Sequence, residues 1–203
     1  MAGKLQIINY ALRLLKQSPI VDVADQNERA RVASDMYEIT RLTAFSSCDW
    51  HCLRKRVKLT KDMEPPAFGF KYRYLLPVDC VRVIGVQDDV NGFFIPYLGG
   101  MFPDDTPIDL TYTIEGDYLL SNQDTCNIMY VVNEQDPTKY DAQLTNVFAY
   151  LLALNMAISL TADNSLATAI ENKYTYFLKT AKSRNALDAT YPTATTPFVA
   201  RRF

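Results

Sequence analysis

The chain has 203 residues, of which 48% are hydrophobic and 22% charged, and its formal net charge at pH 7 is −2. This length suits one domain, or one domain carrying an insertion, with a substantial buried core. The slightly negative net charge argues against a protein that binds DNA over its whole surface. No apolar run approaches the roughly 20 residues of a membrane span, and the N-terminus lacks a signal-peptide layout. We therefore expect an intracellular product with no membrane span.

The N-terminal segment has the hydrophobic spacing of a helix. Between Lys4 and Gln17 the apolar side chains that share one helical face are Leu5, Ile8, Leu12 and Leu15. Ser18-Pro19 ends this pattern, because proline cannot continue a helix.

A second helix is predicted to begin at Asp25 and to run toward Trp50. Glu28, three positions after Asp25, completes the pattern of a capping box. The residues predicted to form its apolar stripe are Val32, Met36, Ile39 and Thr43.

The middle of the chain has strand character. Short β-rich segments, separated by Pro, Gly, Asn and Asp, follow one another from about residue 53 to 132. They read LRKRVKLT, KYRYLLP, CVRVIGV, GFFIPYL, IDLTYTI, DYLLS and NIMYVV. This spacing predicts a small antiparallel sheet or sandwich.

Two helices are predicted after the strands. The first, from Ala142 to Thr161, is apolar almost all round, which predicts a central core helix. The second begins near Asn164 or Ser165, either of which can cap it, and ends near Asp188. Its predicted buried face contains Leu166, Ile170, Tyr174, Phe177 and Ala181.

Together these patterns predict an α+β fold: a four-helix bundle with an inserted small antiparallel β-sheet or sandwich domain. The bundle is expected from residues 1–52 and 138–189, and the inserted β domain from residues 53–137. Residues 190–203 lack periodicity and contain two prolines, so they are predicted to form an extended C-terminal arm.

The only histidine, His51, lies in the sequence CDWHC. A lone histidine without a nucleophile motif favours a structural role at a helix-to-strand junction. A zinc site from Cys48, His51 and Cys52, completed by Cys80 or Cys126, is the alternative, but no second closely spaced ligand pair is present. We expect no catalytic residue, metal or cofactor, and we expect the cysteines to be reduced and mostly buried.

Two further patterns leave other functions open. Glu64, Glu115 and Asp117 are carboxylates from which a cell-wall-degrading hydrolase could draw an acid pair. Arg54, Arg56 and Lys58 would share one face of a strand and contact nucleic-acid phosphates, as in a free DNA-binding module. The alternative is a solvated edge strand whose cations discourage pairing with other chains. The aromatic stripe of Phe70, Tyr72 and Tyr74 is interpreted as sheet packing.

Charge is unevenly distributed along the chain. Residues 62–143 hold 14 Asp and Glu against 4 Lys and Arg, whereas the remaining residues hold 9 acids against 17 bases. These parts could provide complementary faces between subunits.

The order of these features resembles the tail tubular protein A family, the head-to-tail adaptors (connectors) of short-tailed bacteriophages. The residues that carry the resemblance are NERARVASDMYEITR followed by Trp50, YLLPVDCVRVIGV, PYLGG, IDLTYT, DPTKYD and LTNVFAYLLALNMAISLTADNSLATAIENKYTYFLKTAKSRNA. In order, they cover nearly the whole chain. The departures from the family pattern lie in the arm and in the stretch GFFIPYLGGMFPDDTPIDL.

The resemblance implies a virion protein with no catalytic residues, assembled in the host cytoplasm as a homododecameric ring. Such a ring binds the portal protein and the tail nozzle protein, of the tail tubular protein B type, continues the DNA channel used in DNA ejection, and helps to seat tail fibres. The arm is the expected portal- and partner-binding element. Its apolar anchors and charged residues are Phe198, Val199, Arg201, Arg202 and Phe203.

Overall fold

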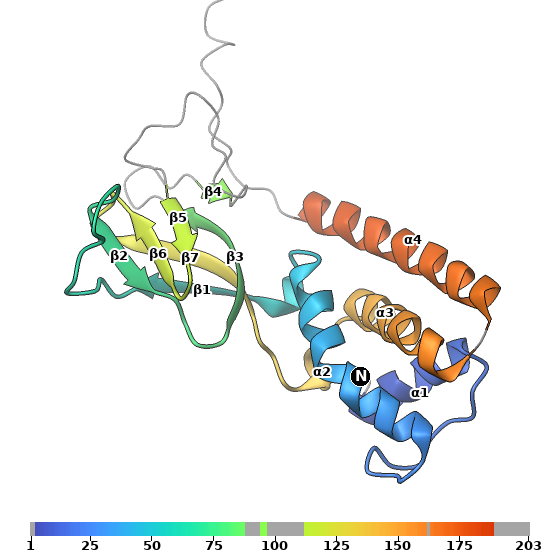
Figure 1. Cartoon of the computed structure of the whole chain (residues 1–203). Coiled ribbons are helices and arrows are strands. Elements are labelled where there is room, and N and C mark those ends of the chain that lie inside the picture. Colours follow the sequence, from blue (N-terminus) through green and yellow to red (C-terminus); the bar gives the residue numbers. More distant parts are fainter. Residues whose placement is uncertain (1–2, 88–93, 97–111, 162, 189–203) are drawn as a thin grey trace, which may run out of the picture. The chain divides into compact units, whose positions relative to one another are not determined.

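The computed structural model describes residues 3–87, 94–96, 112–161 and 163–188 (Figure 1). Within these residues the chain divides into two compact units. The helical unit takes the chain up to Leu53 and resumes at Asn133, and the β unit contains Arg54–Val132. Each unit is described by itself. The predicted C-terminal arm, with Phe198 to Phe203, lies outside the described residues.

The helical unit is organised around one central helix. Its helices are α1 (Lys4–Leu14), α2 (Glu28–Ser46), α3 (Ala142–Leu160) and α4 (Asn164–Asp188). Each of the other three makes its main helix contacts with α3. The buried side chains of α3 include Val147, Phe148, Leu152, Ala153 and Met156. The helix is apolar on several sides because three other helices pack on it.

The predicted four-helix bundle with an inserted sheet is therefore wrong. The main helix contacts join α1, α2 and α4 to α3, so the described helices form a cluster around one helix. The sequence left a single sheet or a sandwich open for the β part, and its strands form two separate antiparallel sheets. Periodicity reports which face of an element is apolar, but it does not report which other element covers that face.

Helix α1 ends at Leu14, before the Ser18-Pro19 stop that the sequence suggested. The backbone NH of Gln17 donates to the carbonyl of Leu12 at 2.9 Å, and the NH of Lys16 donates to that of Arg13 at 3.0 Å. Lys16 has a φ of 57°. These are the features of a Schellman motif, in which a left-handed residue closes the last turn.

The start and the buried face of α2 also differ from prediction. Asn27, not Asp25, caps the helix, accepting from the NH of Ala30 at 2.9 Å. The Asp25 carboxylate instead accepts from the NH groups of Val21 and Asp22. The residues that α2 buries are Ala30, Ala33, Tyr37, Thr40, Arg41, Ala44 and Phe45. Ile39, predicted for the core, is 64% exposed. The small side chains of this face permit close packing on α3.

The caps of the last two helices are aspartates. Asp141 accepts from the NH of Leu144 at 2.7 Å, and α3 keeps its predicted start. Asp163 accepts from the NH groups of Ser165 and Leu166 at 2.9 and 3.1 Å. It is therefore Asp163, rather than Asn164 or Ser165, whose side chain satisfies the free NH groups at the start of α4.

The β unit contains strands in all seven predicted segments. They are β1 (Arg54–Leu59), β2 (Tyr72–Leu75), β3 (Cys80–Gln87), β4 (Phe94–Pro96), β5 (Tyr112–Glu115), β6 (Tyr118–Ser121) and β7 (Cys126–Val132). One sheet has the order β1-β7-β3-β4, and the other has the order β2-β6-β5. A tight hairpin joins β5 to β6 at Gly116, whose φ of 58° favours glycine.

Two rings of the aromatic stripe, Tyr72 and Tyr74, lie in β2 and pack there as predicted, whereas Phe70 precedes the strand. Tyr74 is buried, and its hydroxyl donates to the carbonyl of Gln123 at 2.6 Å. Tyr72 is half-buried, and the Lys61 ammonium lies 3.4 Å from the centre of its ring in a cation–π contact. The rings therefore join β2 to neighbouring loops.

Candidate functional site

Three of the four basic residues of β1 lie on one face of an edge strand. In the pairing with β7, Arg54, Arg56 and Lys58 stand opposite Val131, Met129 and Asn127. Alternate residues of a strand point to the same face, so the three cations share a face. Arg56 and Lys58 are exposed, and Arg54 is half-buried.

A fourth cation joins this face from a strand that is distant in sequence. Arg82 of β3 pairs with Val131, the residue that Arg54 faces from the other side. Arg54 and Arg82 therefore flank one valine. Sequence reasoning missed Arg82 because only the register through β7 brings it beside β1.

Next to these cations lies a depression of about 240 Å³. Its lining includes Arg56 and Lys58, the amides Gln87 and Asn127, and the apolar side chains of Phe94 and Met129. Cations beside amide groups suit an anionic ligand, because guanidinium, ammonium and amide NH groups all donate to phosphate oxygens.

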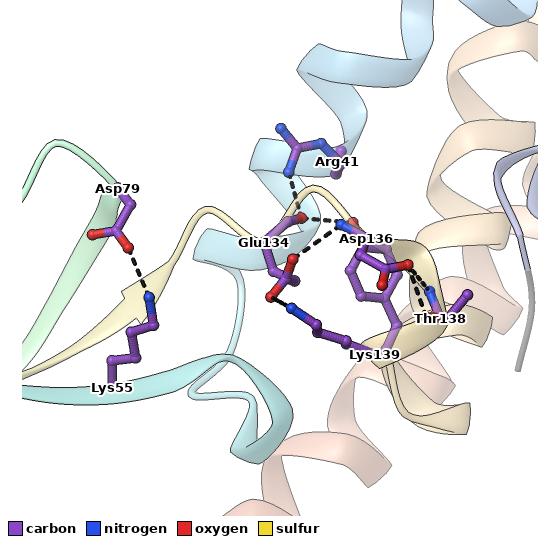
Figure 2. A network of polar contacts seen from close by, with 8 residues as sticks. Arg41, Lys55, Asp79, Glu134, Asp136, Thr138 and Lys139 are labelled. Carbon is purple, nitrogen blue, oxygen red and sulfur yellow. Dashed lines mark hydrogen bonds and ion pairs between the residues drawn. The ribbon is translucent and has the colours of Figure 1, made fainter.

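The opposite face of the same sheet carries an ion pair between β1 and the start of β3. The Lys55 ammonium lies 2.9 Å from the Asp79 carboxylate (Figure 2), and the Tyr130 hydroxyl donates to that carboxylate at 3.0 Å. The hydrogen bond from Lys55 lowers the pKa of Asp79 below its ordinary value. Burial raises the pKa of Tyr130 to about 12, so its hydroxyl stays a donor at neutral pH.

A larger apolar groove of about 490 Å³ lies in the β unit. Residues from the β2–β3 turn and the β5–β6 hairpin line it, among them Leu75, Leu76, Pro77, Val78, Val81 and Ile114. Val78 is fully exposed and Leu75 is 53% exposed. Contiguous exposed apolar side chains of this kind are typical of protein contact sites.

In the helical unit, Arg41 organises the segment through which the chain returns from β7 to α3. Its guanidinium is almost fully buried and donates to the Asn133 side chain at 2.7 Å. A second hydrogen bond runs from the guanidinium to the Glu134 carbonyl at 3.0 Å (Figure 2). It also pairs with Glu38, one turn earlier in α2, at 2.8 Å. Arg41 thus satisfies a side-chain oxygen and a backbone oxygen of this segment.

Glu134 is the second centre of this network. Lys139 lies 2.7 Å from its carboxylate and lowers its pKa below the ordinary value. The Tyr140 hydroxyl donates to its backbone carbonyl at 2.9 Å. The sequence showed no motif for this arrangement, because Arg41 and Glu134 belong to segments on either side of the strands.

The CDWHC segment is a structural junction. Trp50 is fully buried and donates its indole NH to the Ala44 carbonyl at 2.8 Å, which fixes the chain after α2. His51 is exposed, whereas Cys48 is buried and accepts from the Asn185 amide. Within the described residues no group of three or more His, Cys, Asp or Glu is arranged to hold a metal ion. The four cysteines, all in the described part, are not joined by disulfides.

The three carboxylates of the hydrolase hypothesis, Glu64, Glu115 and Asp117, lie in two exposed turns. Glu115 and Asp117 are both exposed, on either side of Gly116. Glu64 pairs with Arg73 at 2.7 Å. Glu115 lines a depression with Phe68 and Phe70, and Asp117 lines the separate groove beside Val78, so these two carboxylates do not face one shared pocket.

In length and hydropathy α3 has the character of a membrane span, a property that the sequence expectation excluded. It is also the helix on which the other three pack. A core helix and a membrane span share this composition.

No protein-family model matches the chain, and no curated protein matches its sequence.

Proposed function

We propose that this chain is a structural virion protein, the head-to-tail adaptor of a short-tailed bacteriophage. Copies of it form a ring of about twelve subunits between the portal protein and the tail nozzle protein. The ring continues the DNA channel and helps to seat tail fibres. In this role the chain acts through its surfaces and carries out no reaction.

The observation that carries the proposal is the order of sequence patterns over nearly the whole chain. NERARVASDMYEITR, YLLPVDCVRVIGV, DPTKYD and the long C-terminal helical segment follow one another as in the tail tubular protein A family. Each pattern is loose by itself, and their order is the specific feature.

Exposed apolar side chains support an assembling role. The described residues of both units expose large apolar side chains, among them Ile39, Leu42 and Ile158 in the helical unit and Phe68, Leu75 and Val78 in the β unit. A subunit buries such side chains against neighbours. The groove beside Val78 is large enough for apolar side chains of another subunit, as a ring of head-to-tail contacts requires.

The test mixes the purified chain with intact portal rings from the same source and counts bound copies by native mass spectrometry. The proposal predicts a discrete complex with about twelve copies. Val78→Asp in the groove should weaken assembly, because it places a charge in an apolar contact. Val21→Asp is the matched control, because Val21 is also strongly exposed but lies outside the groove.

If the folded chain does not bind an intact portal ring, the adaptor proposal is wrong. Duplex DNA binding that is lost in Arg56→Gln/Lys58→Gln would then favour the DNA-binding module. Glycan cleavage that is lost in Glu115→Gln would favour the hydrolase.

A further inference from the structure

The segment between β1 and β2 presents two apolar side chains to solvent. Met63 is fully exposed and Phe68 is 87% exposed. Between them lie Pro65 and Pro66, whose rings restrict the backbone. We call residues 62–71 the projecting loop. Large apolar side chains that are fully exposed on a stiff loop are typical of a contact site, because little conformational freedom is lost when they are bound.

Ion pairs and hydrogen bonds anchor both ends of the projecting loop on the β2-β6-β5 sheet. The Arg73 guanidinium of β2 lies 2.8 Å from the Asp62 carboxylate and 2.7 Å from that of Glu64. The backbone NH of Asp62 donates to the Arg73 carbonyl at 2.9 Å. At the other end, the NH of Lys71 donates to the Asn122 side chain at 3.1 Å. The loop is therefore held at a set position on the β unit.

The projecting loop does not fill the apolar groove of its own chain. Phe68 and Phe70 line a separate depression of about 280 Å³, together with Tyr118. The groove beside Val78 has a volume of about 490 Å³, and none of residues 62–71 is among the described residues that line it. Within the described part of one chain, the loop and the groove are thus not partners.

The groove has the size and the chemistry to receive the side chains of the loop. Its volume lies within the range of roughly 300–1,000 Å³ that is usual for ligand-binding pockets. Leu75, Leu76 and Ile114 are among its apolar lining residues. Insertion of Phe68 would remove an aromatic side chain from water, and such side chains dominate the energetics of protein contacts.

Charges of opposite sign lie beside the two features. Lys71, at the end of the projecting loop, is exposed, and so is Asp117, which lines the groove. Glu64 of the loop and Arg82 of the groove are a second pair of opposite sign. Complementary charges around an apolar contact favour one register of the two surfaces. A second copy of this chain offers all of these groups.

We propose that Met63 and Phe68 of one copy insert into the groove beside Val78 of a second copy. The two surfaces are different patches of the β unit, so the contact is head to tail, and each copy can both give a loop and receive one. Contacts of this kind form a closed ring when the rotation between copies closes. The inference names the element that fills the groove, and for its use in a ring it rests on the adaptor proposal.

The experiment uses two variants of the full chain, each of which removes one half of the contact. Phe68→Asp changes the loop and keeps the groove, whereas Val78→Asp places a charge in the groove and keeps the loop. Sedimentation velocity measures self-association. The original chain should self-associate, and either substitution should weaken this association at least about tenfold.

A mixture of the two variants is the decisive sample. Phe68→Asp supplies an intact groove and Val78→Asp supplies an intact loop, so the mixture should form a heterodimer of one copy each that grows no further. Self-association that survives Phe68→Asp but is lost in Val78→Asp would overturn the proposal, because the groove would then contact something other than the loop. A mixture that forms no heterodimer would also overturn it.

Val21→Asp is the control, because it adds the same charge at an exposed position outside the loop and the groove. It should associate like the original chain. Circular dichroism and thermal melting establish that all three variants are folded. If Val21→Asp weakens association as strongly as the other two, the effect is one of net charge and the proposal is wrong.

Cross-linking detects a contact that is too weak to follow by sedimentation. Ala67→Cys, next to Phe68, and Val78→Cys leave the inserting side chains in place. The two chains are mixed and treated with a short bis-maleimide, and mass spectrometry identifies the linked peptides. A link between positions 67 and 78 of different copies is expected, and Val21→Cys mixed with Val78→Cys should give far less product. Absence of the 67–78 link, in the concentrated chain and on the portal ring, would overturn the proposal.

These outcomes are distinguishable from failure of the adaptor proposal. Portal binding without the 67–78 link would contradict the contact and leave the adaptor role standing. The link without portal binding would support the contact and contradict the adaptor role.

Discussion

The Arg41 guanidinium donates a 2.7 Å hydrogen bond to the side chain of Asn133, which lies 92 positions further along the chain. Arg41 is 2% exposed. It belongs to α2, before the first strand, and Asn133 follows the last strand directly. This contact therefore ties the two passages of the chain through the helical unit.

Arg41→Ala is expected to destabilise the protein by about 2–4 kcal/mol, because it removes two charge-assisted hydrogen bonds to Asn133 and Glu134 together with the packing of a buried side chain. Urea unfolding, followed by circular dichroism, measures the effect. The control Arg31→Ala removes an exposed cation from the same helix and should cost less than about 0.5 kcal/mol. A similar small loss for both variants would show that the Arg41 contacts add little.

Lys16→Gly is expected to stabilise the protein by up to about 1 kcal/mol. Lys16 is held at a φ of 57°, a backbone conformation that costs an L side chain energy and costs glycine none. Thermal melting checks the prediction. Arg13→Gly, inside α1, should destabilise by about 1 kcal/mol instead, because glycine is a poor helix former there.

Asp79→Asn should reduce the loss of stability that the protein shows in acid. The folded-state pKa of Asp79 lies below its ordinary value of 3.8. The stability from its pair with Lys55 is therefore complete above about pH 4 and is lost as the pH falls through the lowered pKa. Since both side chains are partly exposed, the effect should be under about 1 kcal/mol.

This prediction is measured by urea unfolding at pH values from 7 down to 3. Lys55→Gln should give the same flattened acid dependence, because it removes the other partner. If either variant loses stability between these pH values as steeply as the original protein does, the Asp79–Lys55 pair does not contribute to the acid dependence.

The thiol of Cys52 should react slowly in the folded protein. Burial raises the pKa of Cys52 to about 11, and that of Cys80 also to about 11. At pH 8 the thiolate fraction is then about 0.1%, against roughly a quarter for an ordinary cysteine. The labelling rate follows the thiolate fraction, so a thiol reagent should label Cys52 at least about 100-fold more slowly in the folded protein than in 6 M guanidinium. Fast labelling of Cys52 would revive a chemical role for the CDWHC segment.

A chain that ends at Tyr191 should fold normally but fail to bind the portal ring. The missing residues include Phe198, Val199 and Phe203, which the adaptor proposal assigns to partner binding. Thermal melting tests folding, and native mass spectrometry tests docking. Loss of the melting transition, or full portal binding by the shortened chain, would contradict this assignment.

Local patterns predicted the elements well and their partners poorly. The apolar spacing located α3, and the turn residues located all seven strands. Helix caps were less predictable, because Asp25, Asn27, Asn164 and Asp163 are all capable of capping. Only the backbone path decides which of them meets a free NH group.

The candidate functional surfaces were also only partly predictable from local patterns. The alternation of Arg54, Arg56 and Lys58 was readable along one strand, but Arg82 joins them only through the register of β7. The charge division at residues 62 and 143 also does not follow the structural units. Arg54–Val132 holds eight Lys and Arg against eleven Asp and Glu, so most of the imbalance disappears.

By itself the sequence determined the order of helices and strands and the all-apolar character of α3, because these depend on residues a few positions apart. The tertiary structure decided that the strands form two sheets, that the helices gather around α3 and that Arg41 reaches Asn133. Those outcomes depend on contacts between segments far apart in the chain, and no local spacing encodes them.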